Sequence, residues 1–200
     1  RHVVTIEDPI EYLFENNQSY FSQRELHADT PSFASALRAS LRQSPDIIFV
    51  GEIRDEETAK ICLQAAETGH LVLATLHSSG VVDSLERLTN LFPPSERDGL
   101  LKLLSQHLIS ILSQQLLPRP DDGLLLAIEH LQNEAATRSW IKESNLAEVS
   151  DHINRGDNPA NCSFVRFLVA ATQQGYLDNH TARQAAPNAQ DFDRLLSGIS

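Results

Sequence analysis

The fold is decided by residues 47–77, which read IIFVGEIRDEETAKICLQAAETGHLVLATLH. Two apolar runs, Ile47–Val50 and Leu71–Leu76, flank a segment typical of an amphipathic helix. Asp55 is a residue type that caps helix N-termini, and Gly69 is suited to the end of a helix. Buried strands separated by a helix of this length indicate a β-α-β unit, in which the two strands run parallel.

The same alternation extends outward in both directions. Val3–Ile6 predicts another buried strand upstream, and the polar, mixed residues 12–29 predict a hairpin or an irregular loop. Downstream, apolar residues at helical spacing predict helices at about 80–92 and 94–117. We therefore predict an α/β fold with a parallel sheet and flanking helices.

A boundary is predicted at residues 118–123, which read PRPDDG and combine several turn-forming residues. A short strand at Leu124–Ile128 and several helices are predicted beyond it. We accordingly expect an α/β core at 1–117 and a mostly helical C-terminal domain at 118–200.

Composition limits the possible functions of the chain. It has 200 residues, of which 41% are hydrophobic, and its net charge of -11 makes it a poor general binder of nucleic-acid backbones. No apolar run approaches the length that a transmembrane helix needs. Cys62 and Cys162 lie far apart in the sequence and are expected to be free thiols. Because the sequence begins at Arg1, contains no Met and opens directly into an apolar run, we expect it to be a fragment.

Acidic and imidazole side chains follow the three predicted strands. Glu7 and Asp8 follow the first, Glu52 follows the second, and His77 follows the third. Ligands of open parallel sheets bind beyond the carboxyl ends of the strands, so these side chains are expected at one edge. Two carboxylates and a hydrogen-bonding imidazole suit phosphoryl transfer to water with a metal ion. The chain contains no phosphate-binding loop of the form G-x-x-x-x-G-K-[ST].

Each of these residues has a simpler interpretation when taken alone. A carboxylate after a strand is usually a solvated loop residue or a helix cap. His70 taken alone is more often a loop residue, and Arg24, Arg38 and Arg42 taken alone are surface charges. The functional interpretation therefore depends on the whole constellation.

Three motifs resemble those of the type II secretion and type IV pilus ATPases. Residues 41–55, LRQSPDIIFVGEIRD, resemble the family signature that contains its atypical Walker B motif, with Phe49 where an aliphatic residue is usual. Residues 5–11, TIEDPIE, resemble its Asp box, and residues 68–77, TGHLVLATLH, resemble its His box. The resemblance is close over residues 1–117 and looser to about residue 180.

The resemblance implies a RecA-like ATPase that binds ATP and Mg²⁺ between the subunits of a ring. Glu52 would act on magnesium and the hydrolytic water, Glu7 would be the general base, and Asp8 would support the metal shell, directly or through water. His77 would contact the γ-phosphate and His70 would support the same box.

The resemblance also assigns residues and partners beyond the catalytic carboxylates. Arg24, Arg38 and Arg42 match arginines common in the family and would bind nucleotide, within one subunit or across two. The partners implied are further copies of the chain, as a homohexamer, and a polytopic inner-membrane platform protein, with a cytoplasmic location peripheral to that membrane. The family's N-terminal domain and phosphate-binding loop are not in these 200 residues, so we expect the chain alone not to hydrolyse ATP.

Two features favour the retraction branch of the family, the PilT-like proteins. The four-cysteine zinc insert of extension and secretion ATPases is missing, and residues 136–141, ATRSWI, resemble the retraction motif AIRNLI. Thr137, Ser139 and Trp140 depart from that motif, so a PilU-like or other paralogue, non-hydrolysing or accessory in the same ring system, stays open. A nucleic-acid motor on the same core is disfavoured by the net charge of -11 and by the lack of a basic, aromatic stripe.

Overall fold

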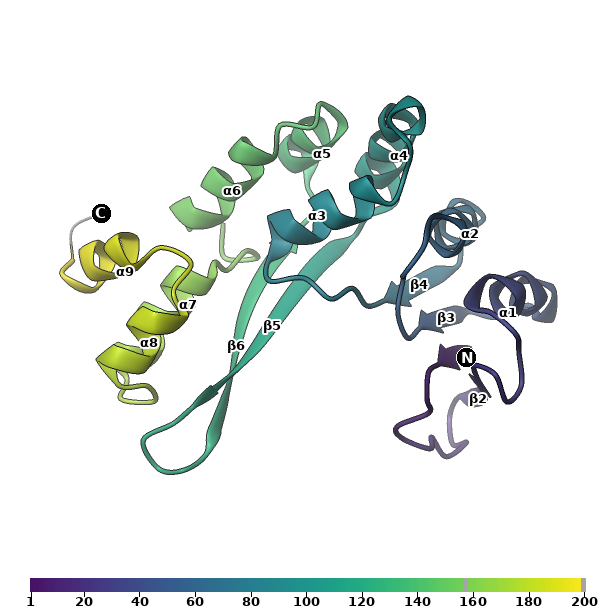
Figure 1. Ribbon diagram of the computed structural model, residues 1–200, viewed down its shortest axis with the longest axis horizontal. Coiled ribbons are helices and arrows are strands. Elements are labelled where there is room, and N and C mark those ends of the chain that lie inside the picture. The colour runs from purple at the N-terminus through teal and green to yellow at the C-terminus, as the bar shows by residue number, and fades with distance from the viewer. Residues whose placement is uncertain (157, 199–200) are drawn as a thin grey trace. The chain divides into compact units, whose positions relative to one another are not determined.

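The computed structural model describes residues 1–156 and 158–198, which form two compact units (Figure 1). The first unit contains residues 1–77 and 90–97, and the second contains residues 78–89 and 98 onward. The predicted division into 1–117 and 118–200 does not coincide with these units and stays a prediction. Residues 157, 199 and 200 of the predicted C-terminal domain lie outside the described residues.

The first unit is built on a four-stranded parallel sheet with the strand order β2-β1-β3-β4. The strands are β1 (His2–Glu7), β2 (Tyr20–Glu25), β3 (Ile47–Val50) and β4 (Leu71–Ala74). The parallel α/β fold expected from the sequence is confirmed. The strand predicted at Leu71–Leu76 is two residues shorter at its end.

Two helices, α1 (Phe33–Ser40) and α2 (Glu56–Glu67), cover one face of this sheet (Figure 1). A short 3-10 turn, Leu41–Gln43, continues α1. Each helix begins where a side chain satisfies a free backbone N–H, because Ser32 accepts from Ser35 and Asp55 accepts from Thr58. The predicted cap at Asp55 is confirmed.

The prediction for residues 12–29 is wrong in its second half. Tyr20–Glu25 forms strand β2, which pairs in parallel with β1 from His2↔Tyr20 to Glu7↔Glu25. The sequence YFSQRE shows no apolar alternation because β2 is an edge strand with few buried side chains. Pairing with β1 makes it a strand, and no pattern within these six residues reports that pairing.

The second unit contains an antiparallel hairpin that contacts helices α7 (Phe164–Gln173) and α8 (Asn179–Ala185). Helix α3 (Val81–Asn90) and most of α4 (Pro94–His107) precede the hairpin, which is formed by β5 (Ser110–Pro118) and β6 (Leu124–Gln132). The helices that follow are α5 (Ala135–Lys142), α6 (Leu146–Arg155), α7 (Phe164–Gln173), α8 (Asn179–Ala185) and α9 (Ala189–Leu196).

The helix predicted at 94–117 is correct only to His107. Residues 110–118 form strand β5, in which Ser113 and Leu117 are buried and the side chains between them are exposed. The leucines and isoleucines there also fall at helical spacing, so the local pattern fits both structures. Pairing of Ser110–Pro118 with Leu124–Gln132 decides for the strand. It also extends the strand predicted at Leu124–Ile128.

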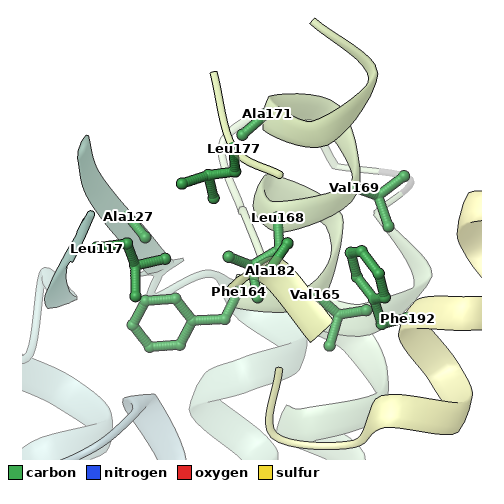
Figure 2. Packing of buried hydrophobic residues seen from close by; sticks show 10 residues of the cluster. All are labelled: Leu117, Ala127, Phe164, Val165, Leu168, Val169, Ala171, Leu177, Ala182 and Phe192. Atoms are coloured by element: carbon green, nitrogen blue, oxygen red, sulfur yellow. The ribbon is translucent and has the colours of Figure 1, made fainter. Parts of the chain in front are cut away.

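Helix α7 carries the core of the second unit (Figure 2). Phe164 and Leu168 of α7 pack with Leu117 and Ala127 of the hairpin and with Phe192 of α9. Burying one such large side chain stabilises a fold by about 1.5–3 kcal/mol. None of the helices in the described part of the chain is long and apolar enough to cross a membrane.

Candidate ATP-hydrolysis site

The carboxyl ends of three neighbouring strands place the predicted catalytic side chains. Glu7 is the last residue of β1, and Asp8 follows it. Glu52 lies two residues after β3, and His77 lies three residues after β4. Because β1, β3 and β4 are adjacent and parallel, all four residues lie at the same edge of the sheet.

Arg54 joins the two carboxylates that were expected to act on the metal. Its Nε lies 2.5 Å from Oε2 of Glu52, and its Nη1 lies 2.9 Å from Oδ2 of Asp8. The carboxylate of Glu52, and after it that of Asp8, raises the pKa of the Arg54 guanidinium by accepting hydrogen bonds. A guanidinium between two carboxylates offsets their mutual repulsion.

His77 contributes an accessible imidazole beside Glu52. Its Nε2 lies 3.4 Å from Oε1 of Glu52, and 80% of its side chain is exposed, against 11% for Glu52. Glu52 is therefore held in the protein while His77 faces solvent. An exposed imidazole next to a held carboxylate can hydrogen-bond an anionic ligand that enters this edge.

Glu7 is buried and oriented by two hydrogen bonds to one of its oxygens. Oε1 accepts from Thr5 Oγ1 at 2.7 Å and from Gln23 Nε2 at 3.0 Å. Only 8% of Glu7 is exposed. Its other carboxylate oxygen accepts no hydrogen bond among the described residues, so it is available to a water molecule.

Comparisons with known proteins identify the family of the chain. Residues 1–157 match the family model described as type II/IV secretion system protein. The chain belongs to this family. It is 38% identical over 192 residues to a twitching motility protein of Neisseria gonorrhoeae, which covers 96% of this chain and 51% of that protein. It is 37% identical over 196 residues to the type IV pilus ATPase PilU of Pseudomonas aeruginosa, which covers 98% of this chain and 51% of PilU.

A solved structure, the pilus retraction motor PilT with bound ADP, has the same fold. It superimposes with a TM-score of 0.89 at 41% identity over 96% of this chain and 55% of that structure. The RecA-like α/β class implied by the resemblance is thereby confirmed. The chain spans about half the length of the curated relatives it matches.

In this type II/IV secretion system protein, the three predicted arginines lie apart from the carboxylates. Arg24 lies in β2, paired with Ile6, on the opposite face of the sheet from Glu7. Arg38 in α1 forms an exposed ion pair with Glu57 at 2.5 Å, and Arg42 is exposed in the 3-10 turn. Their nucleotide-binding roles stay predictions.

His70 does not lie with His77. It precedes β4, at the amino end of the sheet, where its Nδ1 lies 3.0 Å from the carbonyl oxygen of Ala65 and 3.1 Å from Thr68 Oγ1. The four residues of β4 put roughly 10 Å between the two ends of the strand. In this structure His70 organises the turn between α2 and β4, and its nucleotide role stays a prediction.

Sequence reasoning missed Arg54 and Gln23. Arg54 lies two residues after Glu52, and a cation among acidic residues was a usable signal. Its second partner, Asp8, is 46 positions away and is brought close only by the fold. Gln23 belongs to the strand that was not predicted, so nothing in its local sequence connects it with Glu7.

Gly51 allows β3 to approach the end of β1. Its N–H donates to the carbonyl oxygen of Ile6 at 2.7 Å, and an added Cβ would lie 3.0 Å from that oxygen and 3.2 Å from Glu7 Cα. Because both atoms belong to the backbone, Gly51→Ala is expected to destabilise the protein by about 1–3 kcal/mol. Thermal unfolding should show a fall in Tm of about 2–10 °C.

A glycine elsewhere provides the control for this prediction. Gly99 lies in α4 and is exposed, and beyond its own helix no heavy atom of the described residues lies within 4 Å of the place that a Cβ would take. Gly99→Ala should leave Tm unchanged or raise it, because Ala is the better helix former by about 1 kcal/mol. An unchanged Tm for Gly51→Ala would show that the end of β3 can move away from β1 at no cost.

Proposed function

We propose that the chain carries the catalytic half of an ATPase. The observation that supports this most directly is the edge of the sheet where Arg54 bonds to both Asp8 and Glu52 and where His77 lies beside Glu52. Glu7 is buried at the same edge. Carboxylates of this kind divide the tasks of supporting a metal ion and orienting the attacking water. Glu7, with one free carboxylate oxygen, is the general base in this proposal.

The residues at this edge fit Mg²⁺ only as part of a larger ligand set. Among residues 1–156 and 158–198, no group of three or more His, Cys, Asp and Glu side chains is placed to hold a metal ion. Asp8 and Glu52 supply carboxylate oxygens, which Mg²⁺ prefers, and water and nucleotide phosphates would complete its shell. Magnesium bound in this way would neutralise charge on the phosphates.

The proposed work of this ATPase is retraction of a type IV pilus or a related step of secretion. The similarity to the twitching motility protein and to the retraction motor PilT supports it. We propose a homohexamer that acts at the cytoplasmic face of the inner membrane on a polytopic platform protein. Nucleotide binding between copies would explain why Arg24, Arg38 and Arg42 lie away from the carboxylates of their own chain.

The accessory, PilU-like role is the second candidate, because identity to PilU is 37% and identity to the twitching motility protein is 38%. These values are too close to separate the two roles. The carboxylates at the sheet edge favour hydrolysis. PilU is itself a type IV pilus ATPase, so only a non-hydrolysing paralogue of the same ring would bind ATP without turning it over.

Steady-state phosphate release tests the proposal on the protein with its natural upstream sequence. We expect turnover that disappears with EDTA and returns with excess Mg²⁺, since the phosphate charge is then neutralised again. Residues 1–200 alone should show no turnover. ATP binding without turnover by the longer protein would favour a non-hydrolysing paralogue, and absence of both binding and turnover would contradict the ATPase proposal.

A further inference from the structure

One glutamine side chain of the first unit makes three hydrogen bonds at once. Gln23 lies in β2 and is the register partner of Thr5 in β1, so it lies on the same face of the sheet as Thr5 and Glu7. Its Nε2 donates to Oε1 of Glu7 at 3.0 Å and to the carbonyl oxygen of Tyr12 at 2.8 Å. Its Oε1 accepts from the backbone N–H of Phe14 at 2.8 Å. The side chain therefore connects Glu7 with the loop between β1 and β2.

These three partners leave only one orientation for the Gln23 amide. Half a turn would place its oxygen against the Glu7 carboxylate and the Tyr12 carbonyl group, and its NH2 group against the N–H of Phe14. Each contact would then join two acceptors or two donors. An amide that is held from the loop in this way can in turn hold the carboxylate to which it donates.

The Glu7 carboxylate needs this second donor to have a defined direction. The last torsion of a Glu side chain has broad preferences, so one hydrogen bond leaves the group free to turn. The Thr5 hydroxyl donates to Oε1 from the same strand, and Gln23 donates to the same oxygen from the neighbouring strand. With both donors on Oε1, the direction of Oε2, the oxygen available to water, is determined as well.

The loop that holds Gln23 has little packing of its own. Tyr12 and Leu13 are 74% and 85% exposed, and Phe14 stacks on Phe21 of β2 with 4.9 Å between the ring centroids. Loops with few buried contacts open locally at low cost, so hydrogen bonds from β2 matter to this one. The loop backbone and the Gln23 amide therefore hold each other in place.

We infer that Gln23 is a positioning residue for Glu7, and that the backbone of residues 12–14 holds Gln23 in the orientation that this role needs. The role rests on the proposed ATPase function, in which Glu7 is the general base. A general base must lie within hydrogen-bond reach of the water it activates, and small misplacements of a catalytic group are costly. Loss of Gln23 should therefore slow the reaction step and leave nucleotide binding nearly unchanged.

Substitution of Gln23 tests the inference in the protein with its natural upstream sequence. Gln23→Ala should lower kcat about tenfold, less than the loss expected for Glu7→Gln, because Thr5 still donates to Glu7. The Kd of a fluorescent ATP analogue should change by no more than about twofold. Gln18→Ala is the matched control, since Gln18 is an exposed glutamine of the same loop, and it should keep kcat near the parent value. Equal kcat values for Gln23→Ala and Gln18→Ala would overturn the inference.

Gln23→Glu separates hydrogen-bond donation from packing. An ionised Glu has nearly the same shape and can accept from Phe14, but it donates to neither Glu7 nor Tyr12. It should lose at least as much kcat as Gln23→Ala, because a second carboxylate beside Glu7 adds repulsion. A Gln23→Glu variant as active as the parent would show that the side chain only fills space, and would overturn the inference.

A double-mutant cycle with Glu7→Gln separates positioning from general damage. If Gln23 acts through Glu7, Gln23→Ala should lower the residual kcat by less than about twofold in the Glu7→Gln background. The same fold-loss in both backgrounds would show that Gln23 acts elsewhere and would overturn the inference.

Hydrogen exchange tests the link to the loop without relying on turnover. The amide of Phe14 should exchange faster in Gln23→Ala than in Gln18→Ala, because the acceptor of its hydrogen bond is lost. Unchanged exchange there would overturn the inference even in a protein that hydrolyses ATP. Faster exchange in a protein with no turnover would support the link and contradict only the ATPase proposal.

Discussion

Glu52→Gln is expected to lower kcat for ATP hydrolysis by about a hundredfold or more in the protein with its natural upstream sequence. The substitution keeps the size of the side chain but removes the charge that sits between Arg54 and His77. Without that charge the residue neither supports Mg²⁺ nor orients the attacking water. Phosphate release at saturating MgATP measures the loss. The Kd of a fluorescent ATP analogue should change much less, because we place the role of Glu52 in the reaction step.

Glu86→Gln is a matched control for this prediction. Glu86 is exposed in α3, in the second unit, and its substitution removes the same charge from a surface side chain. It should leave kcat within about twofold of the parent value, as expected of a surface change. Equal activities of Glu52→Gln and the parent would mean that the carboxylate after β3 is a structural partner of Arg54 and has no part in the chemistry.

Glu7→Gln is expected to cost about 10²–10⁴-fold in kcat, the range typical of a lost general base. The amide oxygen of Gln can still accept from Thr5 and Gln23, which now bond to Oε1 of Glu7 at 2.7 and 3.0 Å. The fold around β1 should therefore survive, with Tm close to that of the parent. What the variant lacks is a second oxygen able to take a proton from water. Single-turnover phosphate release measures this step directly.

The exposed Glu15 offers the comparison for Glu7. It lies in the loop between β1 and β2, and Glu15→Gln should leave turnover near the parent rate. A Glu7→Gln variant that hydrolyses ATP normally would contradict the general-base role. Loss of ATP binding in Glu7→Gln would also contradict it and would place Glu7 in nucleotide binding.

Much of the sheet and its acidic edge could be predicted from local patterns. Ile47–Val50 is a continuous apolar run followed by an acidic residue, and the parallel sheet does bring Glu52 to the edge where Asp8 and His77 lie. A short apolar run indicates a strand that is covered by other elements. In the structure Ile48 and Val50 of β3 are fully buried, whereas Ile47 and Phe49, on the other face, are half-buried. Strand direction then determines which end carries the site.

The edge strand and the hairpin show where local patterns stop being informative. Residues 20–25 are polar enough for a loop, and residues 110–117 fit a helix as well as a strand. In each case the outcome depends on a partner, β1 for the first and β6 for the second. The energy of that pairing is shared between two segments, so neither segment shows it alone.

The residues alone therefore predicted the parallel α/β class, the three apolar strands β1, β3 and β4, and the acidic side chains that follow them, because these features lie within contiguous sequence. The strand order, with β2 at the edge, came from the tertiary structure. Tertiary structure decided which side chains touch there. Arg54 donates a hydrogen bond to Asp8, 46 positions away, and Gln23 donates one to Glu7 from the neighbouring strand. Glu129 accepts a hydrogen bond from Val81 of α3, 48 positions away. Contacts between distant segments form only when the chain has folded. Their energy depends on both segments, so neither segment's own sequence reveals them.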